Sequence, residues 1–455
     1  MRLLLLLFFV ITFATAIVQY FSVRYPNRVP ELRKVLHLVA IIACAIGTAL
    51  FPNPQFLAIL FLVFSVVLFV VIHYKILNIS TGKSWGIALF PLAFGLLLWS
   101  GQIAVAHIVT AMVILAISDA LAGFVGSRYA TWYWTPLFEP KSVLGSAVFL
   151  VSALVILLCR YDISVESLGA FFLIALLGAG VEMFSWRGSD NFWIPLMIAV
   201  CLEGVGRSLF WTMDGFILLG LAIFVAPIMY RRKWLNREGA VAASFMGIWM
   251  ASLLGIKALA FPVLFLGLGS LVSKLNKKTK EKDGRSSVQV FANGGIGMLF
   301  ALLAPLAEPD KIWFCFVVVF ASANADTLSS EVGKYFRQPT VDIVRWKSMA
   351  SGLSGGVSMA GTLAGLLGSA VVAFIGVLLF RWDTAIFCVV TGLGFAGMLL
   401  DSVLGSVFQA KYVKNGVISE VGDRSDLVRG WHWCDNDLVN LVSVLMVALL
   451  AMFIA

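Results

Sequence analysis

Apolar runs of about 20 residues recur along the whole of this 455-residue chain, and that is the length an α-helix needs to cross a lipid bilayer. Hydrophobic residues make up 61% of the sequence and charged residues 13%, whereas a soluble domain carries about 25% charged residues. A single soluble core could not bury this apolar excess, but acyl chains can surround it. The sequence therefore predicts an all-α fold, a polytopic transmembrane helical bundle.

The apolar runs predict about sixteen spans. The first run resembles a signal peptide at its start, but it continues to about Ser22 and basic residues follow, so we expect a retained span. The expected extents are 2–23, 35–51, 55–73, 85–99, 102–117, 143–159, 165–184, 191–205, 213–230, 238–255, 258–273, 288–305, 311–327, 352–379, 384–406 and 436–454.

The loops between these spans fall into two alternating sets that differ strongly in Lys and Arg. One set holds 27 of the 33 basic residues and the other holds six. The positive-inside rule places the basic set in the cytoplasm. We therefore expect a multi-pass protein of a bacterial inner membrane, with its polar sites on the cytoplasmic side and both termini outside.

Other features of the composition exclude several classes of protein. The net charge of +9 is explained by loop orientation, so we expect no nucleic acid partner. The six cysteines are scattered without a CxxC pair, which favours buried small hydrophobic residues. Four histidines are too few to favour a histidine metal site. No GxxxxGK[ST] phosphate loop and no protein-kinase motif set is present.

The charged loop 231–238 separates two halves, 1–235 and 236–455, that carry polar elements in the same order. Each half has an Asp followed at the same spacing by a Gly, then a Lys-Ser pair with small residues, and later an Asp-Asn pair. With about eight spans in each half, the two sites face the same side, as in a parallel repeat. The paired elements are Asp119 to Gly126 and Asp326 to Gly333, Lys141-Ser142 with Gly145 and Lys347-Ser348 with Gly355-Gly356, and Asp190-Asn191 and Asp435-Asn436.

Ionisable residues at membrane depth are expensive, so their presence indicates a function. Carboxylates hold Mg²⁺ together with substrate phosphates, lysines bind phosphate oxygens, and a helix N-terminus favours an anion. These parts predict a phosphoryl-transfer site in each half. We assign catalytic roles to Asp119, Lys141, Asp190, Asp326, Lys347 and Asp435, with Asp119, Asp190, Asp326 and Asp435 also as Mg²⁺ ligands. The candidate phosphate- or nucleotide-binding residues are Arg33, Lys34, His37, Ser142, Gly145, Arg285, Asn293, Ser348, Gly355 and Gly356.

Simpler roles stay open for several of these residues. Asp119 or Asp326 alone could cap a helix or pair with a cation, and Lys141, like Arg33 and Lys34, could serve only as a positive-inside anchor. His37 could be a core residue, although it lies one helical turn after Arg33. Glu182 lies inside an apolar span shortly before Asp190 and Asn191, and we expect this trio to contribute to the first site.

Residues 30–200 resemble the phytol kinase and dolichol kinase group of membrane enzymes, which are related to CDP-diacylglycerol synthases. In that group an adjacent Gly-Arg pair lies near the Asp motif. In this chain one residue separates Gly126 from Arg128, and the resemblance makes Arg128 a candidate phosphate-binding residue. The resemblance is carried by Arg33-Lys34-Val-Leu-His37-Leu38, by Asp119 through Gly126, by Glu139 through Ser146 and by Asp190 through Pro195.

Residues 238–455 are similar to a separate integral membrane family that includes phytyl-phosphate kinases. This resemblance implies that Glu331 and Asp401 belong to the metal-binding set. The matching residues are Gly284-Arg285, Gln289 through Gly295, Asn324 through Gly333, Gly355 through Ser358, Gly361-Thr362, Asp401 through Gly405, Gln409 and Asp435-Asn436.

The two resemblances imply two consecutive kinase activities in one chain. The first half would phosphorylate an isoprenoid alcohol such as phytol or geranylgeraniol, and the second would convert the monophosphate to the diphosphate. The implied donor is CTP or another nucleoside triphosphate, with Mg²⁺. A cytidylyltransferase that makes a CDP-activated lipid and a tandem-repeat transporter stay open as alternatives. The sequence leaves the length of the isoprenoid, the nucleotide and the oligomeric state undetermined.

Overall fold

The structure is a computed structural model. It describes residues 29–74, 84–274, 284–414 and 416–455 and a few positions between 17 and 25. Most of the expected first span, and the side chain of Arg33, lie outside the described part. The chain forms two compact units, residues 1–212 and 213–455, and each is described by itself.

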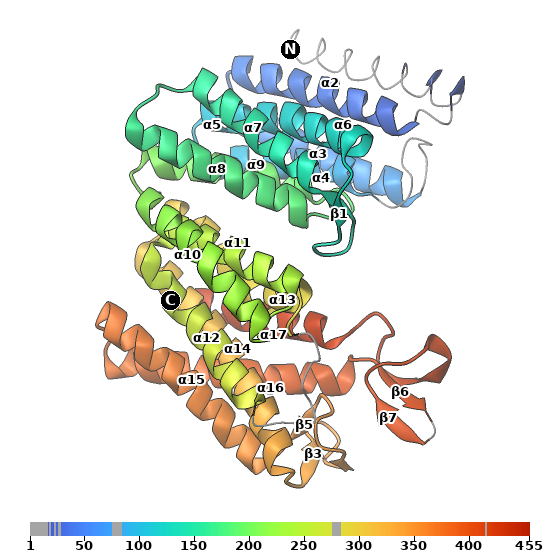
Figure 1. The fold of residues 1–455 in the computed structure, drawn as a ribbon, viewed down its shortest axis with the longest axis vertical. Helices are drawn as coiled ribbons and strands as arrows, with labels where there is room; N and C mark the ends of the chain where they lie inside the picture. Colours follow the sequence, from blue (N-terminus) through green and yellow to red (C-terminus); the bar gives the residue numbers. More distant parts are fainter. Residues whose placement is uncertain are drawn as a thin grey trace. The chain divides into compact units, whose positions relative to one another are not determined.

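The first unit is a bundle of helices with one short hairpin (Figure 1). A π-helical segment, η2 (Leu115–Asp119), joins α5 to α6 without a break, so that one candidate span covers Val105–Tyr129. The other elements are α2 (Val29–Leu50), α3 (Pro54–His73), α4 (Gly86–Ser100), α5 (Val105–Ile114), α6 (Ala120–Tyr129), β1 (Tyr133–Trp134), β2 (Lys141–Ser142), α7 (Val143–Arg160), α8 (Val165–Phe184) and α9 (Asp190–Gly206).

The second unit is a larger helical bundle with two small antiparallel sheets in the loops after α14 and α16 (Figure 1). The strand orders are β4-β3-β5 and β7-β6-β8. The helices are α10 (Thr212–Arg231), α11 (Arg237–Leu254), η3 (Ile256–Leu259), α12 (Ala260–Ser273), α13 (Ser287–Leu303), η4 (Ala304–Leu306), α14 (Pro309–Phe336), α15 (Met359–Phe380), α16 (Thr384–Val407), η5 (Arg424–Asp426) and α17 (Asn436–Ile454). The strands are β3 (Thr340–Asp342), β4 (Ser348–Met349), β5 (Gly356–Val357), β6 (Lys411–Lys414), β7 (Val417–Ser419) and β8 (Leu427–Arg429).

The helices confirm the predicted all-α, polytopic membrane fold. Within the described residues, 11 helices are long and apolar enough to cross a membrane, and Lys34–Leu50 and Gly86–Ser100 are shorter apolar helices. Polar side chains start several of them: Ser142, Ser286 and Ser358 each accept a backbone hydrogen bond at the N-terminus of α7, α13 and α15. Such caps satisfy amide groups that have no partner within the helix.

The predicted ends of three spans need correction. The spans expected at 102–117 and 311–327 continue to Tyr129 and Phe336, so Asp119 and Asp326 lie inside long helices and not at their ends. Small and polar residues follow each Asp. They end the apolar run in the sequence, but the helix continues through them. The span expected to begin at 352 begins at Met359, because Gly352 and Gly355 adopt φ of 94° and 85°, which a helix does not allow.

Candidate functional site

A close crossing of two helices lies near Asp119 in the first unit. Gly126 on α6 faces Gly145 on α7, and a Cβ added to Gly126 would stand 3.3 Å from the Cα of Gly145. Ser142 caps α7 by accepting a hydrogen bond from the Gly145 amide at 3.1 Å. Asp119 precedes Gly126 by about two helical turns and so lies on the same face of the helix.

The second unit repeats this crossing near Asp326. Gly333 on α14 faces Gly361 on α15, and a Cβ added to Gly333 would stand 3.8 Å from the Cα of Gly361. Ser358 caps α15 by accepting a hydrogen bond from the Gly361 amide at 3.3 Å. Asp326 again precedes the crossing glycine by about two turns.

This second crossing corrects the predicted pairing of Lys141-Ser142 with Lys347-Ser348. The structural counterpart of Ser142 is Ser358, and Val357 stands where the first unit has Lys141. Lys347 and Ser348 are exposed, near the start of the short strand β4. The two Lys-Ser dipeptides are not structural equivalents, because the second unit has a three-stranded sheet between α14 and α15.

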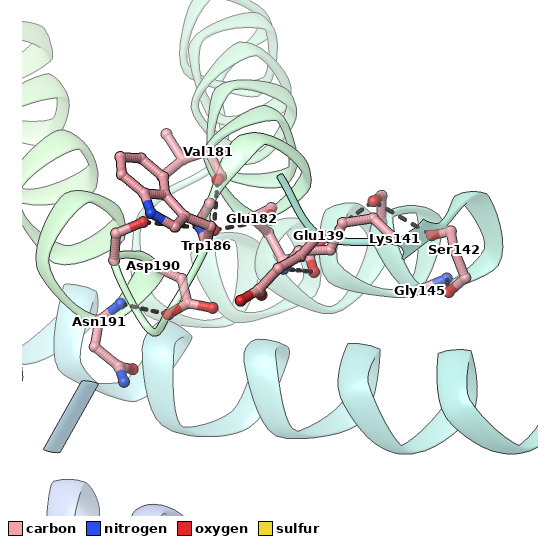
Figure 2. A network of polar contacts seen from close by, with 12 residues as sticks. Glu139, Lys141, Ser142, Gly145, Val181, Glu182, Trp186, Asp190 and Asn191 are labelled. Carbon is pink, nitrogen blue, oxygen red and sulfur yellow. Dashed lines mark hydrogen bonds and ion pairs between the residues drawn. The ribbon is translucent and has the colours of Figure 1, made fainter. Parts of the chain in front are cut away.

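In the first unit, Lys141 and Glu182 form the centre of a polar network (Figure 2). The Lys141 ammonium donates to Glu182 Oε1 at 3.0 Å, and Ser146 on α7 donates to Oε2 at 2.9 Å. Glu182 is 9% exposed. Both of its oxygens are therefore engaged, as a buried carboxylate requires. Of the predicted trio, Glu182 and Asp190 both interact with Lys141, whereas the side chain of Asn191 lies against Gly86.

Several charges surround Lys141. Burial alone would lower the pKa of its ammonium, but Asp190, Glu182 and Asp119 outweigh burial and raise that pKa. A Cβ added to Gly123, one turn after Asp119, would stand 3.1 Å from the Lys34 ammonium. Lys34 and Lys141 both interact electrostatically with Asp119. The first site thus combines three carboxylates with two amines.

Asp190 and two other residues predicted for the first site make further contacts close to them in the fold. Asp190 Oδ1 accepts a hydrogen bond from the Asn191 amide at 2.9 Å. Arg128 is exposed, and its guanidinium lies 5.8 Å from the ring centre of Phe124 on its own helix. His37 packs edge-on against Phe90, with ring centres 6.2 Å apart.

In the second unit, Asp326 on α14 and Asp401 on α16 form a pair of interacting carboxylates. Asp401 is 5% exposed and accepts a hydrogen bond from Ser443 on α17 at 3.1 Å. With the side-chain amide of Asn440 rotated by 180°, its nitrogen donates a hydrogen bond to the same Asp401 oxygen at 2.9 Å. Lys334 supplies a positive charge that interacts with Asp326.

The remaining residues predicted for the second site do not all lie together. One joins the Asp326 cluster, and the others make local contacts elsewhere in the unit. The Lys334 ammonium lies 3.9 Å from Glu331 Oε1, so Glu331 joins the cluster around Asp326. Asn293 donates to the Gln289 carbonyl of its own helix at 2.9 Å. Asp435 is exposed and caps α17 by accepting from the Leu438 amide at 2.9 Å. Gly355 lies against Ser406, where a Cβ would collide with the Ser406 backbone, and Gly356 lies against Thr340.

The loops beside the second site contain charged residues that the sequence did not single out. Lys411 is 3% exposed, and its ammonium donates to the Ser354 carbonyl at 2.6 Å. Glu420 accepts from the Ser354 amide and interacts electrostatically with both Lys411 and Asp401. Burial lowers the pKa of Lys411 more than Glu420 and Asp342 raise it. These contacts connect the loop after α14 with the loop after α16.

Asp342 ties the same two loops together. Its carboxylate is 3% exposed and accepts from Ser406 Oγ at 2.7 Å, from Arg345 at 3.3 Å and from Arg429 at 3.0 Å. Burial alone would raise the pKa of Asp342, but the hydrogen bonds from Ser406 and from the backbone amides of Arg345 and Val344 lower it.

Replacing Asp342 with Asn is therefore expected to destabilise the protein by about 2 kcal/mol, because the arginines lose their buried counter-charge. Thermal unfolding in detergent measures this loss, and Asp423→Asn, at an exposed Asp in the same loops, is the matched control. Since the folded pKa is lowered, the wild-type advantage is complete above the ordinary pKa of about 3.9. It disappears as the pH falls through the folded value. An unchanged midpoint at neutral pH would show that the network adds no stability.

The carboxylates fit a magnesium ion shared with a substrate better than one enclosed by protein. Among the residues that the structure describes, no group of three or more His, Cys, Asp or Glu side chains could hold a metal together. Asp326 and Asp401 are nevertheless close enough to interact. Mg²⁺ commonly takes one or two carboxylates and completes its shell with phosphate oxygens and water.

The fold and these polar clusters define a multi-pass integral membrane protein with charged sites inside its helical units. The chain belongs to the family described as integral membrane protein DUF92, whose model matches residues 220–448. That match lies within the second unit.

The chain is also similar to three other proteins. An uncharacterized membrane protein of Methanocaldococcus jannaschii is 33% identical over 213 residues, which cover 45% of this chain and 89% of that protein. An uncharacterized membrane protein of Synechocystis sp. is 29% identical over 279 residues, 58% of this chain and 93% of that protein. The chloroplastic protein VTE6 of Arabidopsis thaliana is 25% identical over 237 residues, 49% of this chain and 66% of that protein. No solved structure matches the chain.

Proposed function

We propose that the chain is a bifunctional membrane isoprenoid kinase. The first unit transfers the terminal phosphoryl group of CTP, or of another nucleoside triphosphate, to a prenol such as phytol or geranylgeraniol. The second unit transfers a phosphoryl group to the resulting monophosphate and yields the diphosphate. In each step the nucleotide leaves as its diphosphate, and the acceptor oxygen forms the new bond to phosphorus.

The recurring helix crossing is the observation that carries the proposal. In both units an intrahelical Asp lies about two turns from a glycine contact with the capped N-terminus of the next long helix. Carboxylates bring a cation, and a helix N-terminus favours the phosphate that the cation binds. The resemblances to phytol kinases and phytyl-phosphate kinases rest in part on the segments that contain these Asp and Gly residues.

The amines of each site would bind phosphate oxygens. Lys141 and Lys34 serve this role in the first unit, and Lys334 serves it beside Asp326 in the second. When bound, Mg²⁺ would neutralise charge on the transferred phosphoryl group, held by Asp119 with Asp190 in the first unit and by Asp326 with Asp401 in the second. Lys347 and Asp435, predicted from the sequence as catalytic, with Asp435 also as a Mg²⁺ ligand, and Arg128, predicted as a phosphate-binding residue, stay predictions.

A labelled-nucleotide assay tests the function. Purified full-length protein in nanodiscs is incubated with Mg²⁺ and CTP that carries its label either on the γ-phosphate or on the cytosine ring. The prenols and prenyl monophosphates of several chain lengths serve as acceptors. We expect γ-label, and not cytosine label, in both the monophosphate and the diphosphate lipid.

Other outcomes would reject the kinase reaction. Cytosine label in the lipid would identify a cytidylyltransferase, which releases pyrophosphate. No label in any lipid, with prenyl phosphate carried across the membrane of proteoliposomes, would identify a transporter. Diphosphate without monophosphate formation would restrict the function to the second unit.

A further inference from the structure

The second unit has a partly open, apolar cavity of about 350 Å³ between α10, α11, α12 and α13. Its walls are largely aliphatic and include Leu218, Ala222, Ala243, Leu266 and Val290. The volume falls in the range of about 300–1,000 Å³ that is typical of small-molecule sites. Such a lining suits a hydrocarbon chain and would leave the polar groups of a nucleotide without partners.

Among the described residues, three polar side chains line this cavity: Ser244, Gln289 and Arg285. Ser244 donates to the Ala240 carbonyl of its own helix at 2.9 Å. Gln289 accepts from the Ser286 amide at 2.9 Å in the capping box of α13. Both side chains therefore serve local helix structure, whereas Arg285 brings a permanent positive charge to the cavity.

Arg285 lines the cavity and lies close to α14, the helix that carries Asp326. Its guanidinium carbon is 5.2 Å from the ring centre of Phe265. A Cβ added to Gly269 on α12 would collide with the guanidinium and would stand 3.1 Å from the methyl group of Thr327. Arg285 and Thr327 therefore both lie beside Gly269, and Thr327 directly follows Asp326 in α14.

We propose that this cavity holds the single hydrocarbon tail of a prenyl monophosphate while Arg285 binds its phosphate beside Asp326. The inference rests on the proposed function of the second unit and names the residues that would select its substrate. A guanidinium can form two parallel hydrogen bonds with phosphate oxygens. The bilayer is as apolar as the cavity, so burial of the tail adds little affinity. The cavity instead positions the phosphate and discriminates between tails by their shape.

Narrowing the cavity from either of two walls tests the inference. Ala243→Phe on α11 and Ala222→Phe on α10 each place a ring in it. Binding of geranylgeranyl monophosphate to the full chain is measured in phosphatidylcholine nanodiscs without nucleotide. We expect each variant to bind this twenty-carbon ligand about tenfold more weakly, because the ring occupies space that the tail needs while the phosphate is bound at Arg285. Binding of the ten-carbon geranyl monophosphate should change by less than about twofold, because its shorter tail leaves room for the ring.

Gly220→Phe is the matched control. Gly220 is on α10, is exposed and has open space around its missing Cβ, so the added ring should leave binding of both ligands unchanged. Thermal unfolding of all three variants separates local narrowing from loss of the fold. With two independent walls, one poorly folding variant does not decide the test.

The possible results separate the cavity from the reaction. Wild-type binding of the twenty-carbon ligand by the folded narrowed variants would overturn the cavity assignment even if the protein is a kinase. Equal competition by phosphatidic acid, which has two tails, would also overturn it. Tail-dependent binding by a protein that transfers no phosphoryl group would support the cavity and reject the kinase.

Discussion

Replacing Asp326 with Asn is expected to lower the rate of monophosphate-to-diphosphate conversion by about 100-fold or more, while formation of the monophosphate continues. Asn keeps the size of the side chain but removes one of two interacting carboxylates, leaving Asp401 with its hydrogen bonds from Ser443 and Asn440. A neutral amide is a weak partner for a magnesium ion shared with phosphate. The γ-labelled CTP assay, supplied with prenol, should accumulate labelled monophosphate.

Asp310→Asn provides the matched control for this result, because Asp310 is exposed in the first turn of the same helix, α14. It should form both products at wild-type rates. If Asp326→Asn instead makes diphosphate normally, the second unit's carboxylates have no part in the transfer. If it loses both steps while remaining folded, one composite site performs both reactions.

The membrane fold could be predicted from the sequence because the bilayer imposes a simple length and composition on each helix. The error at α6 and α14 has the same origin. Hydropathy reports where apolar side chains stop, but helices continue wherever a neighbouring helix packs against small residues such as Gly126 and Gly333. The apolar runs therefore predict where the helices lie but not where α6 and α14 end.

Part of the first site was also predictable. Glu182 stood out because an acid in an apolar span needs a partner, and the structure gives it Lys141 at 3.0 Å. The second-unit pairing failed because a dipeptide match says nothing about which residue caps the following helix. Ser358 caps α15 whereas Ser348 is an exposed residue of β4, and the capping role depends on where α15 begins.

The network around Asp342 and Lys411 lay beyond sequence reasoning for a different reason. Its partners come from two loops separated by α15 and α16, and each residue taken alone resembles an ordinary basic or acidic loop residue. Only tertiary contact shows that Lys411 is buried and that Asp342 joins Arg345 to Arg429. The cavity beside Arg285 is similarly a property of packing between four helices.

Replacing Asp119 with Asn is expected to produce the reverse of the Asp326 phenotype. The first unit keeps Lys34 and Lys141 but loses one of the carboxylates with which both interact. Conversion of prenol to monophosphate should fall by about 100-fold or more, and added monophosphate should still become diphosphate. Asp162→Asn, at an exposed Asp of the same unit, is the control and should leave both rates unchanged.

The two Asp variants together decide whether the helix crossings are separate reaction sites. If each crossing gathers its own cation and phosphate, the losses are complementary, and a mixture of the two variant proteins restores diphosphate formation from prenol because the monophosphate can diffuse between molecules in the bilayer. If the crossings are only a packing device, both Asn variants retain activity, since a neutral side chain in the helix interior is easier to bury than a carboxylate. Product analysis of the two variants reconstituted together in the same proteoliposomes therefore distinguishes chemistry from packing at the same two residues.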